Sequence, residues 1–277
     1  MRQVYLIPNM ITAFGLSCGL FVVFKVNMTE PGVGIYELLC SSALLLLLAA
    51  FADLLDGAIA RIIRAESEFG SMFDSLADAI SFGVAPSVLF LKSLALHPTT
   101  GLSFFAVLGA MLYTICGILR LVRFNVKAHA IQENKCAIAA YKKNFTGLPI
   151  PAAGAGAISV NLFLNSRFAQ DWISLSYTIH AIMLTCLMIV LGCLMISKWK
   201  FPSLKTLHFR VSSFYLILFT VLFAIFILYG ISYYLPFVFL ICSLGYIIVG
   251  CILTIIRIFA GKKSKTLIDF ELENEKD

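Results

Sequence analysis

The sequence contains little charge and few of the residues that build zinc sites. Only 13% of its 277 residues are charged, against about 25% in an ordinary soluble domain, which excludes a typical water-soluble fold. The four histidines show no ligand spacing, and no two of the eight cysteines form a CxxC pair. A zinc centre or a dithiol redox motif is therefore not indicated. Most of the cysteines fall in apolar stretches, where cysteine packs as a small residue.

Long apolar stretches make up most of the chain. Hydrophobic residues account for 60% of it, and the mean hydropathy is +0.95. A helix needs about 20 mainly apolar residues to cross the hydrocarbon core of a bilayer. We therefore predict an all-α, polytopic membrane bundle with about eight transmembrane helices. The expected spans are approximately 6–26, 38–60, 72–96, 102–124, 147–165, 172–196, 211–234 and 236–259.

These spans leave no room for a separate soluble domain. We expect one membrane domain over residues 1–260, with its catalytic core at about 5–200, and a charged tail at 261–277. All of the 21 lysines and arginines except Lys25, Lys92 and Arg167 fall on the side that holds both termini and the turn after the second span. The positive-inside rule makes that side cytoplasmic. The net charge of +6 then suits anionic lipid head groups and not nucleic acid.

Four aspartates interrupt the apolar sequence between Phe51 and Gly83. Each acidic side chain at the middle of a spanning helix costs about 2.5 to 3.5 kcal/mol, so four without partners would cost about 10 kcal/mol. At 100° per residue, the small and polar residues of each helix share one face. These are Asp53, Asp56, Gly57, Ala60 and Arg61 on the first helix, and Gly70, Asp74, Asp78 and Ser81 on the next. We therefore expect two acidic stripes that face each other across the turn near residues 64–68.

Sites rich in carboxylates suit hard divalent cations. Mg²⁺ and Mn²⁺ prefer oxygen ligands, whereas zinc prefers the imidazole and thiolate groups that this face lacks. Two such ions would offset the four negative charges, and paired metal ions are also a known device for displacement at phosphorus. Glycine and alanine on the same face leave room for a diphosphate, and Arg61 adds a cationic fork for phosphate.

The aspartate spacing also carries a family resemblance. Asp53-x-x-Asp56-Gly57-x-x-Ala60-Arg61, followed after eight residues by Gly70-x-x-x-Asp74-x-x-x-Asp78, resembles the full signature of the CDP-alcohol phosphatidyltransferases. Five further segments resemble the branch of that family that makes phosphatidylserine in bacteria. They are PNMIT at 8–12, SEFGSMFDSLADAISFGVAP at 67–86, RLVRFNV at 120–126, FTGLPIPAA at 145–153 and SKWKFPSLK at 197–205. The resemblance covers about residues 5–255 and is weakest in the last two spans.

This resemblance implies a reaction of phospholipid biosynthesis in a bacterial cytoplasmic membrane. The hydroxyl of L-serine would attack the β-phosphorus of CDP-diacylglycerol, giving phosphatidylserine and CMP. The resemblance implies that Asp53 and Asp74 bridge two divalent ions, Mg²⁺ or Mn²⁺, and that Asp56 completes the first ion's site. It gives Asp78 two roles, as ligand of the second ion and as general base on the serine hydroxyl. It also implies a homodimer.

Other residues are candidates for substrate binding. The resemblance places Gly57, Arg61 and Ser67 against the nucleotide or diphosphate of the donor, and the remaining candidates are Asn9, Thr12, Ala60, Gly70, Arg120 and Arg123. Asn9 and Thr12 could instead cap or pack the first helix through local hydrogen bonds. Arg120 and Arg123 could be anchors of the positive-inside kind, or could form a pocket for phosphate or the serine carboxylate.

Three alternatives share some of these features. A sister enzyme that uses glycerol 3-phosphate or inositol phosphate as acceptor would contain the same four aspartates. A membrane prenyltransferase would also bind a diphosphate through aspartates, but its acidic motifs are expected far apart in sequence. A cation transporter could bury carboxylates at mid-membrane, usually on broken helices in repeated halves, and no repeat is visible in the sequence.

Overall fold

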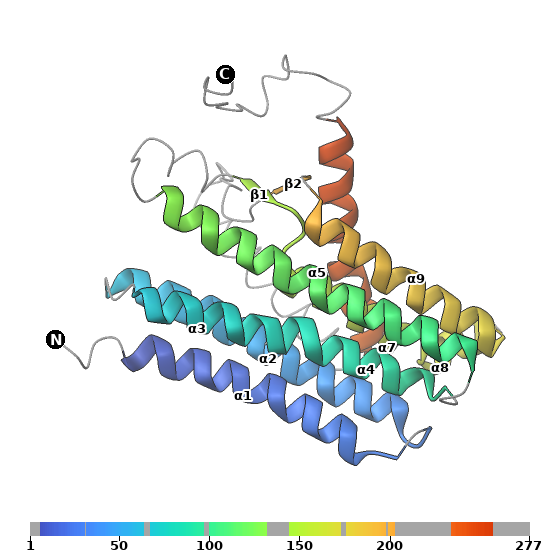
Figure 1. Ribbon diagram of the computed structural model, residues 1–277. Coiled ribbons are helices and arrows are strands. Elements are labelled where there is room, and N and C mark those ends of the chain that lie inside the picture. Colours follow the sequence, from blue (N-terminus) through green and yellow to red (C-terminus); the bar gives the residue numbers. More distant parts are fainter. Residues whose placement is uncertain are drawn as a thin grey trace, which may run out of the picture.

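The computed structural model describes residues 6–30, 32–63, 67–96, 100–131, 144–172, 176–197, 199–202 and 234–256. Within these ranges the chain forms a bundle of long helices (Figure 1). The helices are α1 (Leu6–Met28), α2 (Ile35–Ile62), α3 (Glu68–Asp78), the π-helical turn η1 (Ala79–Val84), α4 (Ala85–Leu94), α5 (Gly101–Ile131), α7 (Ile150–Leu164), α8 (Arg167–Trp172), α9 (Tyr177–Ile196) and the helix Tyr234–Ile256.

Six of the described helices are long and apolar enough to cross a membrane. They are α1, α2, the continuous helical run Glu68–Leu94, the part Gly101–Val126 of α5, α9 and the helix Tyr234–Ile256. The predicted helical membrane bundle is thereby confirmed. Helix α7, expected as a span at 147–165, has only 15 residues and is shorter than a usual crossing. The expected span 211–234 and the tail 261–277 lie almost wholly outside the described residues, so the count of eight stays a prediction.

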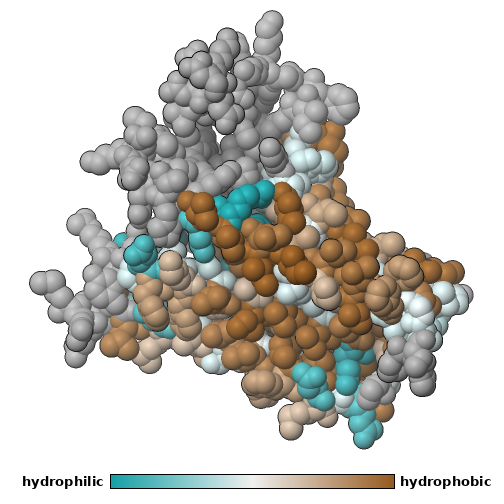
Figure 2. Space-filling view, viewed as in Figure 1, coloured by the Kyte–Doolittle hydropathy of each residue, from teal (hydrophilic) through white to brown (hydrophobic). Residues whose placement is uncertain are grey.

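Large apolar side chains cover the outside of the bundle. Phe24, Leu54, Phe104 and Ile241, which lie on four different helices, are between 61% and 70% exposed. Figure 2 shows hydrophobic residues over most of the middle of the visible face. Exposure of this much apolar surface to water is unfavourable, at about 25 cal/mol per Å², and lipid tails remove that cost. The chain is an integral membrane protein.

Close packing between helices depends on small residues. A Cβ atom added at Gly15 of α1 would lie 3.4 Å from the Cβ of Ala52 on α2, and one added at Gly192 of α9 would lie 3.4 Å from the Cα of Tyr113 on α5. Small residues let helix backbones approach in this way. Helices α1 and α2 form one closely packed pair, α5 and α9 form another, and α7 contacts both α2 and α9.

A short two-stranded ribbon was not among the expectations for an all-α chain. Strand β1 (Asn144–Thr146) pairs antiparallel with β2 (Lys200–Pro202), near the ends of α5 and α9 in Figure 1. Gly147 follows β1 with a φ of 86°, a conformation that favours glycine. Its N–H donates to the Trp199 carbonyl at 2.7 Å. The ribbon therefore joins two segments, FTGLPIPAA and SKWKFPSLK, that are far apart in the sequence.

The π-helical turn η1 begins directly after Asp78. Pro86, the second residue of α4, has no N–H and cannot donate to the carbonyl of Phe82 four residues earlier, and its ring would crowd that carbonyl in a regular α-helix. A wider turn avoids this clash, and the N–H of Ala85 accordingly donates to the carbonyl of Ile80, five residues earlier. Proline thus explains a π turn at this place, and such turns are frequent at functional sites.

Candidate active site

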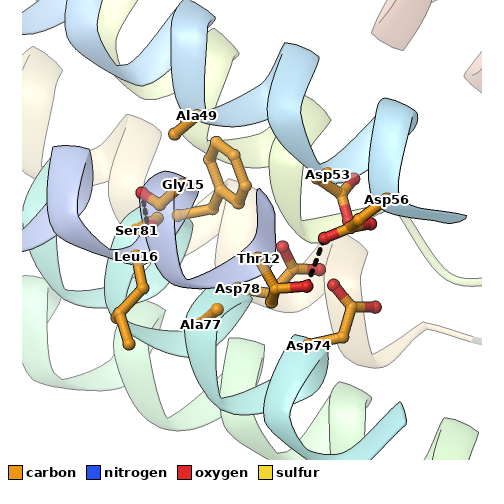
Figure 3. Close-up of a pocket in the computed structure, with 11 residues that line it drawn as sticks. Thr12, Gly15, Leu16, Ala49, Asp53, Asp56, Asp74, Ala77, Asp78 and Ser81 are labelled. Atoms are coloured by element: carbon orange, nitrogen blue, oxygen red, sulfur yellow. Dashed lines mark hydrogen bonds between the residues drawn. The ribbon is translucent and has the colours of Figure 1, made fainter. Parts of the chain in front are cut away.

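The four aspartates line one recess between α1, α2, α3 and η1. Figure 3 shows Asp53 and Asp56 projecting from α2 toward Asp74 and Asp78 of α3. Gly15 and Ala49 also line the recess, where they provide little bulk. The two acidic stripes therefore face each other across this recess.

Three of these carboxylates converge closely. One oxygen each from Asp53, Asp56 and Asp74 can be chosen so that all three lie within 4.8 Å of one another. Asp56 is only 5% exposed, and the side chains of Asp53 and Asp74 lie within hydrogen-bonding reach of each other. Asp78 lies one helical turn beyond Asp74 and lines the same recess.

This arrangement fits a divalent cation. Negative charges held a few ångströms apart repel one another, and the repulsion is stronger at a partly buried site than in water. A cation between Asp53, Asp56 and Asp74 would remove that repulsion. The donor atoms are all oxygens, which are the ligands that Mg²⁺ and Mn²⁺ prefer.

Thr12 connects α1 to this cluster. Its side chain is buried, and its hydroxyl lies 2.5 Å from Oδ2 of Asp56 and 3.1 Å from the carbonyl of Pro8. A hydroxyl has one proton to donate, and the shorter contact is the one to the carboxylate. Thr12 therefore orients Asp56. Its second contact, to the Pro8 carbonyl, is the kind of local hydrogen bond within the first helix that was the alternative role for this residue.

Ser67, Gly70 and Asn9 meet at the first turn of α3. Ser67 is the N-cap residue, and its hydroxyl accepts the N–H of Gly70 at 3.0 Å, as an N-cap serine commonly does. A Cβ atom at Gly70 would lie 3.2 Å from Oδ1 of Asn9. The polar side chain of Asn9 therefore lies against the start of α3, where helix N–H groups favour an anion.

The last turns of α2 carry Gly57, Ala60 and Arg61. A Cβ atom at Gly57 would meet no atom of the described residues within 4 Å, so this glycine does not serve helix packing there. Arg61 is exposed, and its Nε donates to the Gly57 carbonyl at 2.8 Å. The described residues therefore leave the backbone at Gly57 uncovered, next to a cationic side chain.

The two arginines of RLVRFNV lie in different surroundings. Arg120 is 8% exposed and is close enough to Asp78 and Tyr246 to interact electrostatically with both. Arg123 instead donates to the carbonyl of Ile196 at 2.7 Å, at the C-terminal end of α9, where positive charge stabilises a helix. Arg120 therefore lies near an aspartate of the recess, and its burial argues against a simple surface anchor.

Tyr113 of α5 was not among the predicted site residues. This side chain is fully buried and donates to the Phe82 carbonyl in η1 at 2.8 Å. A buried tyrosine hydroxyl usually requires a partner, and Pro86 predicts a backbone carbonyl without its usual donor. These two signals could have suggested the contact, although the sequence does not show that the two segments are adjacent.

Comparison with known proteins agrees with this geometry. The family model for CDP-alcohol phosphatidyltransferase matches residues 5–249. The protein named CDP-diacylglycerol--serine O-phosphatidyltransferase from Bacillus subtilis is 34% identical over 199 residues, which cover 72% of this chain and 91% of that protein.

Proteins of the same name from two other bacteria are also similar. The one from Mycobacterium leprae is 35% identical over 167 residues, covering 60% of this chain and 50% of that protein, so this chain matches only half of its length. The one from Helicobacter pylori is 29% identical over 219 residues, covering 78% of this chain and 80% of that protein. Because the family match includes both aspartate-bearing helices and most of the chain, this protein belongs to the CDP-alcohol phosphatidyltransferase family.

Proposed function

We propose that this protein is a phosphatidylserine synthase, which transfers the phosphatidyl group of CDP-diacylglycerol to the hydroxyl of L-serine and releases CMP. The observation that carries the reaction class is the convergence of Asp53, Asp56 and Asp74 in one recess of a family member. The names of the relatives from Bacillus, Mycobacterium and Helicobacter support serine as the acceptor.

The donor would lie along the end of α2 and the start of α3. Its diphosphate would rest on the uncovered backbone at Gly57 and beside Ala60, next to the guanidinium of Arg61. Ser67, Asn9 and Gly70 would border the nucleotide at the first turn of α3. The acyl chains stay in the bilayer, which requires the recess to open sideways between helices.

Four carboxylates would hold the divalent ions. Asp53, Asp56 and Asp74 are the ligands that the geometry supports most directly, and Asp78 would complete the second position. When bound, the ions would neutralise the diphosphate and stabilise the charge that develops on the leaving CMP. Thr12 would keep Asp56 in its binding orientation.

Asp78 would act as the general base. As the serine oxygen forms its bond to the β-phosphorus, the serine proton passes to the Asp78 carboxylate. The bond from the β-phosphorus to the bridging diphosphate oxygen breaks, and CMP leaves with that electron pair. Arg120, which interacts electrostatically with Asp78, would attract the carboxylate of the incoming serine.

We further propose that both termini and the active site lie on the cytoplasmic side of a bacterial inner membrane, and that the enzyme is a homodimer. The start of α1, the end of α2 and the start of α3 lie at one end of the bundle with the ends of α5 and α9 (Figure 1). These are the segments to which most basic residues are adjacent in the sequence, as the positive-inside rule requires of a cytoplasmic face.

An acceptor panel tests the function. Purified protein in detergent would receive CDP-diacylglycerol, Mg²⁺ or Mn²⁺, and L-serine, glycerol 3-phosphate or inositol phosphate in separate reactions. We expect CMP and phosphatidylserine with L-serine only. CMP release that requires one of the two phosphorylated acceptors and ignores serine would replace this proposal with the corresponding sister activity.

A further inference from the structure

The π turn that follows Asp78 is held by side chains from α5. Pro86 has no N–H for the carbonyl of Phe82, and the hydroxyl of Tyr113 donates to that carbonyl at 2.8 Å. The bond lies in the interior, because Tyr113 is 0% exposed and Phe82 is 3% exposed. A buried carbonyl that loses its donor is costly, so this hydroxyl replaces the bond that proline removes.

The next carbonyl of the turn has a similar arrangement. The Gly83 carbonyl accepts the hydroxyl of Ser87 at 3.0 Å and lies 3.3 Å from the hydroxyl of Thr114, which is also 3.0 Å from the Ala110 carbonyl of its own helix. The two hydroxyl oxygens lie 2.8 Å apart. Consecutive residues of α5, Tyr113 and Thr114, therefore lie against consecutive carbonyls of η1.

Two glycines bring other helices close to the same turn. A Cβ atom at Gly19 of α1 would lie 2.8 Å from the Cα of Ser81, and one at Gly154 of α7 would lie 3.2 Å from the Phe82 carbonyl oxygen. The turn is thus enclosed by α1, α5 and α7. Because Asp78 is the residue directly before the turn in one continuous helix, a shift of the turn would move Asp78 relative to Asp53 on α2.

We propose that Tyr113 is a positioning residue for Asp78 and acts through the π turn, with Thr114 in a smaller supporting role. Arg120 lies seven residues after Tyr113 on α5, which places the two on the same face of the helix. One face of α5 would therefore fix the backbone behind Asp78 and place positive charge beside its carboxylate. The inference rests on the proposed function, in which Asp78 is the base.

Two tyrosine variants provide a matched test. Tyr113→Phe removes only the hydroxyl, and Tyr177→Phe removes a hydroxyl that donates to the Leu94 carbonyl at the other end of the same helical run. We expect kcat of Tyr113→Phe to fall about tenfold or more, since small displacements of a reacting group are costly. The KM values for donor and serine should stay within about twofold, as expected when only transition-state interactions are lost. Tyr177→Phe should keep the wild-type kcat.

Hydrogen exchange gives a readout that does not depend on activity. Amide exchange measured by mass spectrometry over residues 79–85 should be about tenfold faster in Tyr113→Phe than in Tyr177→Phe, because one buried bond to the turn is lost. If Tyr113→Phe does not fold, Thr114→Val replaces it, with a smaller fall in kcat and the same unchanged KM values.

Each result has one interpretation. Equal exchange over the turn in the two tyrosine variants, kcat values within twofold of each other, or a raised KM without a lower kcat would each overturn the positioning role. If the wild-type protein makes no phosphatidylserine, the proposed function fails instead. The exchange comparison then still shows whether Tyr113 holds the turn.

Discussion

Two helix pairs of this bundle pack with similar closeness, but among the described residues the carboxylate cluster lies at the α1–α2 pair. Gly15 allows α1 to approach α2, and Gly192 allows α9 to approach α5. In each case a Cβ atom added at the glycine would lie 3.4 Å from the nearest atom of the other helix. Among the residues that the structure describes, the group of three carboxylates that could hold a metal lies beside the α1–α2 pair. Small residues therefore account for close packing in both pairs, and the carboxylates distinguish the functional one.

Threonines show the same contrast. Thr185 on α9 donates to the carbonyl of Ala181 in its own helix at 2.8 Å, which is the ordinary arrangement for a threonine inside a helix. Thr12 has such a local contact too, but it also reaches Asp56 on the neighbouring helix. Thr12 in the first pair thus contacts a carboxylate of the site, whereas Thr185 in the second pair bonds to a backbone carbonyl of its own helix.

Removal of divalent cations should produce the largest loss of activity, and it acts on the carboxylate cluster at the α1–α2 pair. We expect EDTA to lower CMP release by more than about 100-fold and added Mg²⁺ or Mn²⁺ to restore it, because the carboxylate cluster near α1 and α2 would lose its counter-charge. The assay is CMP formation from CDP-diacylglycerol and L-serine. Full activity in metal-free buffer would contradict the proposed chemistry of Asp53, Asp56 and Asp74.

Asp78→Asn should have the next largest effect. Loss of a general base typically lowers the rate by about 100-fold to 10,000-fold, while the affinity for CDP-diacylglycerol should change little. Initial rates and equilibrium donor binding would measure the two quantities. The control is Thr185→Val in the other pair, which should retain its activity. Turnover near the wild-type value in Asp78→Asn would remove the base assignment.

Thr12→Val should lower kcat/KM by about tenfold, because a hydrogen bond to a charged group contributes about 1.5 to 3 kcal/mol. The Mg²⁺ concentration for half-maximal activity should rise as well, since Asp56 would lose its orientation. Thr12→Ser retains the hydroxyl and should behave like the wild type. Equal Mg²⁺ requirements in all three proteins would restrict Thr12 to a local role in α1.

Substitution of the two arginines on α5 would extend the comparison to that helix. Arg123→Ala should lower the free energy of unfolding by about 1 kcal/mol, because the end of α9 loses a cationic donor. Its KM for serine should be unchanged. Arg120→Ala should raise that KM severalfold. A raised KM in both variants would place Arg123 in the substrate pocket after all.

A pair of glycine substitutions should give the smallest effects. One should change the KM for the donor without loss of stability, and the other should lower stability without a change in KM. Gly57→Ala introduces no contact with the described residues and should leave stability unchanged or raise it by about 0.5 to 1 kcal/mol, but KM for CDP-diacylglycerol should rise. Gly109→Ala places a Cβ 3.0 Å from Cγ2 of Thr185 and should lower Tm with an unchanged KM. Thermal unfolding and donor kinetics of both variants would decide whether Gly57 serves the ligand.

Much of the fold follows from patterns along the chain. Hydropathy predicted α1 and α2 to within three residues and the start of α5, which continues seven residues beyond the predicted end. The 100° period predicted that Asp53 and Asp56 would face Asp74 and Asp78. The ribbon of β1 and β2 was not predicted, because three-residue strands leave little periodicity to detect. The π turn was not predicted either, although Pro86, which has no N–H to donate to the Phe82 carbonyl, explains it.

The sequence by itself determined that the chain lies in a membrane, that its long segments are helical and that two helices carry acidic faces. These properties are local, since hydropathy and helical period depend on neighbours within a few turns. Only the tertiary structure decided which polar side chains meet across helices, whether at the site or away from it. Thr12 on Asp56, Tyr113 on Phe82 and Arg123 on Ile196 join residues that are 44, 31 and 73 positions apart, and such pairings depend on how the helices pack rather than on any one helix.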